Sequence, residues 1–316
     1  MNKIPVDLFT GFLGTGKTTM IKEYAKYLMK KGQNIAIIEN DFGGVNVDRL
    51  LLQELEGDLC DVEQIVGGNV PEDWQRRFRA KLIAMGMLGY DHVIVEPSGI
   101  FDTDSFFDVL QEDTVRRWFC PGSVVAMMDS DEIAELSTES LSLMATQLSQ
   151  AGIMLFAKEN SQDLEKKKTV LNKLNEELTQ EAPAETAQKA WVPPVLWKNL
   201  YEYCEQDFEQ IETCGYGNGR MEKWVFRTTD VYQTIYFMEE EIAGIDWEKT
   251  LDRLFSDDAA AVYRVKGFWQ QEEQWYQLNA TKKHRTISPV PFGQNVMVVI
   301  GEHLQKEELQ KQFILR

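Results

Sequence analysis

Eight residues near the start of the chain have the types and spacing of a phosphate-binding loop. The segment Gly11-Phe-Leu-Gly-Thr-Gly16-Lys17-Thr18 matches the pattern G-x-x-x-x-G-K-[ST]. Its glycines let the backbone curl, so that successive N–H groups converge on phosphate oxygens at the positive end of a helix. Lys17 supplies a mobile positive charge, and the Thr18 hydroxyl is placed to bind Mg²⁺. The pattern therefore predicts a site for an oligophosphate with Mg²⁺.

Two acidic residues follow apolar runs, where they could hold the metal ion or its water shell. Glu96 ends the run HVIVE and precedes Pro-Ser-Gly99, whose last N–H could meet a γ-phosphate and act as a conformational switch. Asp41 follows the run at 34–39 and is the second candidate for contact with metal or water. The alternative functions, a strand cap for Glu96 and a turn for Asp41, stay open.

The elements that must position these residues alternate between apolar runs and helical patterns. Such alternation is typical of βαβ units with a mostly parallel sheet flanked by helices. We expect five strands, at residues 4–10, 34–39, 92–96, 123–128 and 153–157, and three helices, at residues 18–31, 74–87 and 135–150.

The second half has a different pattern, which predicts a smaller α+β domain. A glycine-rich stretch at 214–220 is typical of a linker, so we place one domain at residues 1–215 and another at 221–316. In the second domain we expect strands at 223–229, 260–269, 274–279 and 295–300, and helical segments at 234–243, 247–255 and 305–313.

The composition disfavours several classes of partner. The formal net charge of −18 repels nucleic acid and anionic lipid, and no apolar stretch approaches the roughly 20 residues that span a bilayer. Four cysteines and three histidines are scattered, which fits neither a disulfide framework nor a CxxC zinc site. No secretory signal is visible, so we expect a cytoplasmic protein.

Several segments resemble the CobW-like P-loop GTPases, relatives of the GTPases that mature urease and hydrogenase. The resemblance is carried by GFLGTGKTT, by IENDFGGVNVD at 38–48 and VEPSG at 95–99, and in the second domain by RVKGF at 264–268 and VMVVIGEHLQKEEL. It implies a P-loop NTPase fold and a cytoplasmic metallochaperone or cofactor-assembly factor. Such a protein binds GTP with Mg²⁺, hydrolyses it slowly and often dimerises, here as a nucleotide-dependent homodimer.

The resemblance also assigns site residues. It implies catalytic roles for Lys17, Glu96 and Asp41, and Mg²⁺ binding through the nucleotide by Thr18, Glu96 and Asp41. It implies that the nucleotide is bound by ten residues: Gly11, Gly14, Thr15, Gly16, Lys17, Thr18, Thr19, Gly99, Lys158 and Asn160.

Two departures concern transition metals. The family's Cys-x-Cys-Cys motif should fall near residues 68–71, where this chain has Gly-Asn-Val-Pro, and Gly44 replaces the glutamate that usually follows Phe-Gly. Tight binding of such metals needs thiolate or imidazole ligands. We therefore expect no family-type transition-metal site, and the missing cysteines favour remodelling of a client over direct metal carriage.

A third departure concerns the base. The guanine-reading motif Asn-Lys-x-Asp is replaced here by Ala157-Lys158-Glu159-Asn160. Asn160 cannot accept both hydrogen bonds from the guanine edge, and losing one to a charged acceptor costs about 1.5–3 kcal/mol. ATP or relaxed purine use therefore stays open beside GTP.

These observations favour a Mg²⁺-dependent triphosphatase that acts as an assembly or activation factor for an unidentified client protein that depends on a metal or cofactor. Two alternatives stay open. One is a nucleotide-binding regulatory module with negligible hydrolysis, and the other is a direct metal chaperone with a non-cysteine site. A small-molecule kinase is a weaker alternative.

Overall fold

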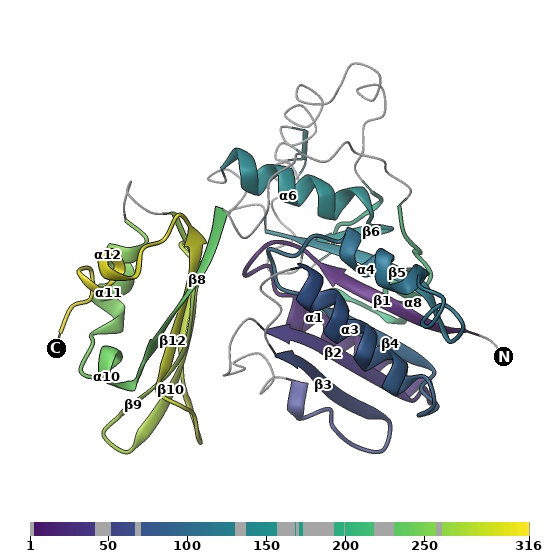
Figure 1. Cartoon of the computed structure of the whole chain (residues 1–316), viewed down its shortest axis with the longest axis horizontal. Coiled ribbons are helices and arrows are strands. Elements are labelled where there is room, and N and C mark those ends of the chain that lie inside the picture. The colour runs from purple at the N-terminus through teal and green to yellow at the C-terminus, as the bar shows by residue number, and fades with distance from the viewer. Residues whose placement is uncertain are drawn as a thin grey trace. The chain divides into compact units, whose positions relative to one another are not determined.

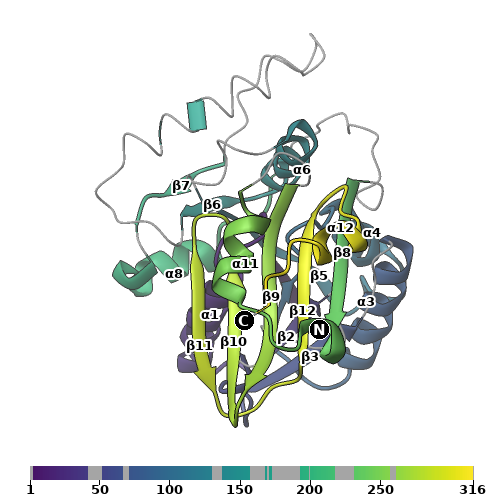
Figure 2. The same cartoon turned by 90° about the vertical axis from the view of Figure 1, so that its left-hand side faces the viewer.

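The computed structural model describes residues 3–41, 52–66, 71–129, 137–156, 168, 171–172, 193–198, 200–217, 231–256 and 261–315. The chain divides into two compact units (Figures 1 and 2). The first comprises residues 1–41 and 48–225, and the second comprises residues 42–47 and 226–316. The finer domain boundaries, 1–215 and 221–316, stay a prediction.

The first unit contains a sheet of seven strands and the helices that join them. Its strands are β1 (Ile4–Thr10), β2 (Ile35–Asp41), β3 (Cys60–Val66), β4 (His92–Glu96), β5 (Phe119–Met128), β6 (Ile153–Phe156) and β7 (Val195–Leu196). Its helices are α1 (Lys17–Lys30), α3 (Pro71–Met85), α4 (Asp104–Gln111), α6 (Thr138–Ser149), η1 (Leu200–Glu202) and α8 (Glu205–Glu212).

All strand pairs of this sheet are parallel, in the order β3-β2-β4-β1-β5-β6-β7. Helices cover both faces of the sheet: α1 and α8 lie on one side, and α3 and α4 on the other (Figure 2). Central strands such as β4 are therefore buried on both faces. The prediction of a parallel sheet flanked by helices is confirmed. From β1 the chain continues to β2 and β3, toward one edge of the sheet, whereas from β5 it continues to β6 and β7, toward the other edge. A ligand site is expected where such a sheet reverses direction, at the carboxyl ends of its strands.

The core on the α1 face explains why these residues form these elements. Met20, Ile21, Tyr24 and Leu28 recur at helical spacing in α1 and are fully or almost fully buried against strand residues such as Phe9. The packing fixes the start of α1 close to the end of β1, so the loop between them has little freedom.

The second unit contains an antiparallel sheet of five strands with short helices. Its strands are β8 (Tyr232–Met238), β9 (Ala261–Gln271), β10 (Gln274–Ala280), β11 (Arg285–Val290) and β12 (Val296–Glu302), in the order β11-β10-β9-β12-β8. Its helices are α10 (Glu239–Ile242), α11 (Trp247–Leu254) and α12 (Lys306–Gln310). Trp247, Phe237 and Val265 are among the residues of a second hydrophobic core in this unit. The predicted α+β domain is confirmed.

One expectation for the second unit is wrong. The segment 234–243, predicted to be helical, continues strand β8 to Met238 and forms only the four-residue helix α10. Residues of β8 pair with β12 along the whole strand, and this pairing overrides the local helical pattern. The strand predicted at 223–229 lies outside the described residues.

In the part of the chain that the structure describes, no helix is long and apolar enough to cross a membrane.

Candidate functional site

The loop between β1 and α1 depends on residues without side chains. Gly11, Gly14 and Gly16 all have positive φ, at 133°, 79° and 90°. A Cβ on Gly11 would lie 2.2 Å from the carbonyl oxygen of Met127 in β5. This position therefore needs glycine for its backbone conformation and for its contact with the neighbouring strand.

The side chains of Lys17 and Thr15 donate hydrogen bonds to carbonyl oxygens of the loop itself. The Lys17 Nζ donates hydrogen bonds to the carbonyl oxygens of Gly11, at 2.8 Å, and Phe12, at 3.0 Å. The Thr15 Oγ1 donates to the same Phe12 oxygen at 3.0 Å. Both side chains are buried. These bonds hold a positive charge against the loop that the sequence predicts to bind phosphate.

The structure brings together two of the predicted metal-binding residues. The Thr18 Oγ1, in the first turn of α1, donates to the Glu96 Oε1 at the end of β4, and the distance is 2.8 Å. Both side chains are buried. A hydroxyl and a carboxylate are hard oxygen ligands, which Mg²⁺ prefers. The donor set therefore fits this ion.

Gly99, in the segment after β4, lies against the same loop. A Cβ on Gly99 would lie 2.6 Å from the Leu13 backbone nitrogen and 2.8 Å from its Cα. The predicted switch segment and the loop thus meet backbone to backbone, and only glycine permits this approach.

The structure describes the other predicted site residues only in part. Asp41 is the last residue of β2, and Glu39 two residues earlier pairs in register with Glu96 of β4. Because of this pairing, Glu39 lies beside Glu96, and its side chain is buried. The Asp41 side chain, Gly44, residues 67–70, Lys158 and Asn160 lie outside the described residues.

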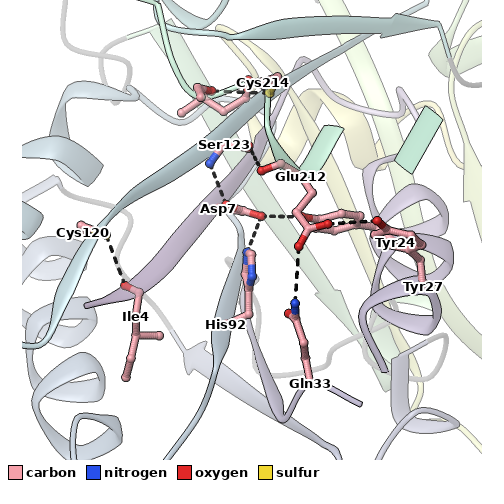
Figure 3. Close-up of polar contacts among 12 residues, drawn as sticks. Ile4, Asp7, Tyr24, Tyr27, Gln33, His92, Cys120, Ser123, Glu212 and Cys214 are labelled. Carbon is pink, nitrogen blue, oxygen red and sulfur yellow. Dashed lines mark hydrogen bonds and ion pairs between the residues drawn. The ribbon is translucent and has the colours of Figure 1, made fainter. Parts of the chain in front are cut away.

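A buried polar network supports the elements that carry the loop (Figure 3). Asp7 of β1 accepts hydrogen bonds from the Tyr24 hydroxyl of α1, at 2.8 Å, and the Ser123 backbone N–H of β5, at 2.6 Å. Its Oδ2 also lies 2.5 Å from the His92 Nε2 of β4. Burial, with the neighbouring Asp7, raises the pKa of Tyr24, so the phenol stays protonated and donates.

The same network leaves no space beside Asp7. A Cβ on Gly122 of β5 would lie 2.1 Å from the Asp7 Oδ1. Ser123 continues the network toward α8, because its Oγ donates to the Glu212 carbonyl oxygen at 2.8 Å. Five elements, β1, α1, β4, β5 and α8, are thereby joined by buried or partly buried hydrogen bonds.

Thiol and imidazole ligands do not gather in the part of the chain that is described. No group of three or more His, Cys, Asp or Glu residues there could hold a metal ion. Burial raises the pKa of the Cys60 thiol to about 12, which disfavours the thiolate that binds metal.

Sequence reasoning missed two residues that contact the segment after β4. Gln147 of α6 and Trp74 of α3 are both buried, at 1% exposure each. Each sits inside a helix, away from any motif. A buried glutamine has no sequence signal that separates it from an exposed one.

Two family descriptions match the chain. The nucleotide-binding domain described as CobW/HypB/UreG matches residues 5–186, and the cobalamin synthesis protein cobW C-terminal domain matches residues 240–314.

Curated relatives and solved structures add to these matches. The zinc chaperone YjiA of Escherichia coli (strain K12) is 30% identical over 141 residues, which are 41% of this chain and 42% of YjiA. The zinc chaperone CobW of Sinorhizobium sp is 30% identical over 139 residues, 42% of this chain and 38% of that protein. The matches thus span about two-fifths of these relatives. The Zn(II)-bound YjiA GTPase structure from E. coli, at 19% identity, covers 99% of this chain and 98% of its own, with a TM-score of 0.43.

Proposed function

The chain belongs to the CobW/HypB/UreG family of nucleotide-binding domains, and from this we propose that it is a Mg²⁺-dependent nucleoside triphosphatase serving a metal- or cofactor-dependent client protein. The observation that carries the proposal is the buried contact between Thr18 and Glu96 beside the phosphate-binding motif. It joins the two side chains that a nucleotide-bound Mg²⁺ would need.

The loop and the start of α1 would bind the phosphates. Backbone N–H groups of the loop and the positive end of α1 offer donors and partial positive charge to an oligophosphate. Lys17, now bonded to the carbonyl oxygens of Gly11 and Phe12, would turn toward the β- and γ-phosphate oxygens. Its burial makes this charge–charge interaction stronger than it would be in water.

Thr18 and Glu96 would hold Mg²⁺, with Asp41 as a further acidic residue at the end of β2. The ion, when bound, would neutralise charge on the phosphates as the terminal bond breaks. The Thr18 hydroxyl would then direct a lone pair to the ion in place of the proton it now donates to Glu96. Glu96 would remain beside it as a carboxylate.

The segments after β2 and β4 would report which nucleotide is bound. A γ-phosphate gives the Gly99 N–H an acceptor that a diphosphate lacks, so the triphosphate would order this segment. Such ordering would create or remove a surface for the client or for a second copy of the chain, and hydrolysis would reverse it. We place this cycle in the cytoplasm.

The relatives' names support a link to metal, since YjiA and CobW are called zinc chaperones. Residues 68–71 of this chain contain no cysteine or histidine. We therefore favour remodelling of a metal-dependent client over direct carriage through thiolates. Tight stoichiometric binding of Zn²⁺, Co²⁺ or Ni²⁺ to the purified protein, measured by calorimetric titration, would favour the direct metal chaperone instead.

Phosphate release tests the enzyme against a binding module without turnover. With Mg²⁺ and GTP or ATP, the wild type should release phosphate, and Lys17→Ala should lose that release. Lys26→Ala, an exposed lysine of the same helix paired with Glu23, is the matched control and should behave like the wild type. Tight nucleotide binding with no release by the wild type would leave the regulatory module as the function.

The base preference needs its own measurement. Calorimetric titration of GTP, ATP and XTP, each with Mg²⁺, compares the three bases directly. Asn160 in place of aspartate predicts that GTP is preferred over ATP by less than the roughly 10- to 150-fold that a charged acceptor would give. A GTP preference beyond that range would contradict this assignment.

A further inference from the structure

One buried glutamine spans the segment that follows β4. The Gln147 Nε2, from α6, donates hydrogen bonds to the carbonyl oxygens of Gly99 and Phe101, each at 3.2 Å. Its side chain is 1% exposed. One amide group therefore holds two carbonyls of the segment 97–102, which forms neither strand nor helix.

The same segment is held from two other sides. Phe101 packs on Trp74 of α3, with ring centroids 4.4 Å apart and planes at 53°. The Phe101 N–H donates to the Ser98 carbonyl at 3.1 Å, which closes a turn around Gly99. Gly99 itself meets the backbone of Leu13 in the phosphate loop. Helix α6, helix α3 and the loop together surround the turn.

Gly99 is the point at which this support affects chemistry. Glycine has the widest backbone freedom, so the direction of its N–H must be fixed by its surroundings. The Ser98 carbonyl shares a peptide plane with the Gly99 N–H, and it is fixed by the bond from the Phe101 N–H. The two bonds from Gln147 hold the rest of this turn, at the Gly99 and Phe101 carbonyls, and the contact with Leu13 fixes its position. The N–H of Gly99 is then aimed without further reorganisation when an acceptor arrives.

Packing alone does not account for glutamine at position 147. Its Oε1 is buried and meets no hydrogen-bond donor among the described residues. A buried acceptor in that state is unfavourable, and an apolar side chain of similar size would avoid the cost. The amide N–H₂ is the part of the side chain with partners, and both partners are carbonyls of the turn.

We propose that Gln147 is a positioning residue that aims the Gly99 N–H at the terminal phosphate and so sets the preference for triphosphate over diphosphate. The inference rests on the proposed nucleotide binding. The amide of Gln147 donates to carbonyls of the turn, so it would act on the phosphate through Gly99. Loss of its amide should weaken the contact that only a γ-phosphate makes and leave the contacts of the β-phosphate unchanged.

The test compares two affinities in the full-length protein. Calorimetry with Mg²⁺ measures the binding of guanosine 5′-(β,γ-imido)triphosphate and GDP, and of the corresponding adenosine pair. For Gln147→Leu, we expect the ratio of triphosphate to diphosphate affinity to fall about 10-fold, while diphosphate affinity stays within about two-fold. Gln150→Leu is the matched control, because Gln150 directly follows α6 and donates to Asp104 instead of to the turn. Its ratio should equal that of the wild type.

A second variant keeps the test independent of folding. Gln147→Met places an unbranched apolar side chain of similar length at this buried position and removes the donor without burying a charge, so it should lower the ratio as Gln147→Leu does. An unchanged ratio in a folded variant, or equal loss of both nucleotides, would overturn the positioning role and leave Gln147 a structural residue. Failure of the wild type to bind either nucleotide would instead overturn the proposed function.

Discussion

Two glycines shape the candidate nucleotide site by what they lack. Gly11 lies against the Met127 carbonyl of β5, and Gly99 lies against Leu13 of the loop. In each case a single methyl group would separate segments that the site needs close together. The site is therefore defined by missing side chains as well as by Lys17, Thr18 and Glu96.

The first prediction at the residue scale concerns Gly99→Ala. The new Cβ would lie 2.6 Å from a backbone atom, so we expect a loss of about 1–3 kcal/mol in the free energy of unfolding, together with weaker triphosphate binding. Urea denaturation and calorimetry measure the two effects. Gly57→Ala is the control, because nothing lies within 4 Å of its Cβ position, and it should change stability by less than about 0.5 kcal/mol. Equal stability of the two variants would show that the turn can move away from the Leu13 backbone at little cost in free energy.

A second residue-scale prediction concerns the cysteines. Burial raises the pKa of Cys60 to about 12, so its thiolate is scarce at pH 8, while Cys204 is exposed. Treatment of the native protein with iodoacetamide, followed by mass spectrometry of peptides, should label Cys204 first and Cys60 only after unfolding. Rapid native labelling of Cys60 would mean that β3 opens readily.

At the scale of elements, the sequence predicts the central strands well and misses the edges. β1 and β4 are buried on both faces, read as continuous apolar runs, and match their predicted bounds. β3, β7, β11 and β8 are the edge strands of the two sheets, and none was predicted. An edge strand is partly solvated, so its pattern mixes polar residues or proline, such as Pro289 in β11, with apolar ones.

The site shows the same division. The contact between Thr18 and Glu96 could be predicted from the motif. The loop that leads from β1 into α1 and the end of the neighbouring β4 both lie at the carboxyl edge of one parallel sheet. The roles of Gln147 and Trp74 could not be predicted, since each depends on which faces of α6 and α3 pack against a turn far away in sequence.

A prediction at the scale of elements concerns the pairing of α1 with α8. Burial raises the pKa of Glu212, but hydrogen bonds from Lys31 and Tyr27 outweigh this and lower it below the ordinary 4.5. A lowered folded-state pKa stabilises the fold above the unfolded value, and the contribution is lost as the pH falls through the folded value. Glu212→Gln should therefore cost about 1 kcal/mol at pH 7 and little near pH 3.

Urea unfolding of wild type and variant at both pH values measures this difference. Glu209→Gln removes the same charge from an exposed position of α8 and serves as the control. A cost for Glu212→Gln that persists undiminished near pH 3 would show that packing, and not the carboxylate, joins the helices.

At the scale of the whole molecule, the chain has two compact units with separate cores. The site residues that the structure brings together, Thr18, Glu96 and Gly99 with the loop, belong to the first unit. Trp247, a buried residue of the second, packs near Phe313 with ring centroids 5.6 Å apart. Stability and nucleotide binding can therefore be changed in different parts of the chain.

We expect Trp247→Ala to destabilise the second unit by about 3–5 kcal/mol without changing nucleotide affinity. Differential scanning calorimetry should show one unfolding transition lowered, while saturating nucleotide raises the other, by about 2.7 kcal/mol at one hundred times its Kd. A single transition that both changes move together would mean that the units unfold as one.

The close approach of Gly122 to Asp7 restricts how this chain can diversify. As long as position 7 carries aspartate, any side chain at 122 meets its carboxylate at 2.1 Å. In a combinatorial library, larger residues at 122 should survive selection only in clones that also carry a shorter residue at 7. Such clones would also lose the acceptor for Tyr24 and Ser123. Position 122 can therefore change only together with position 7.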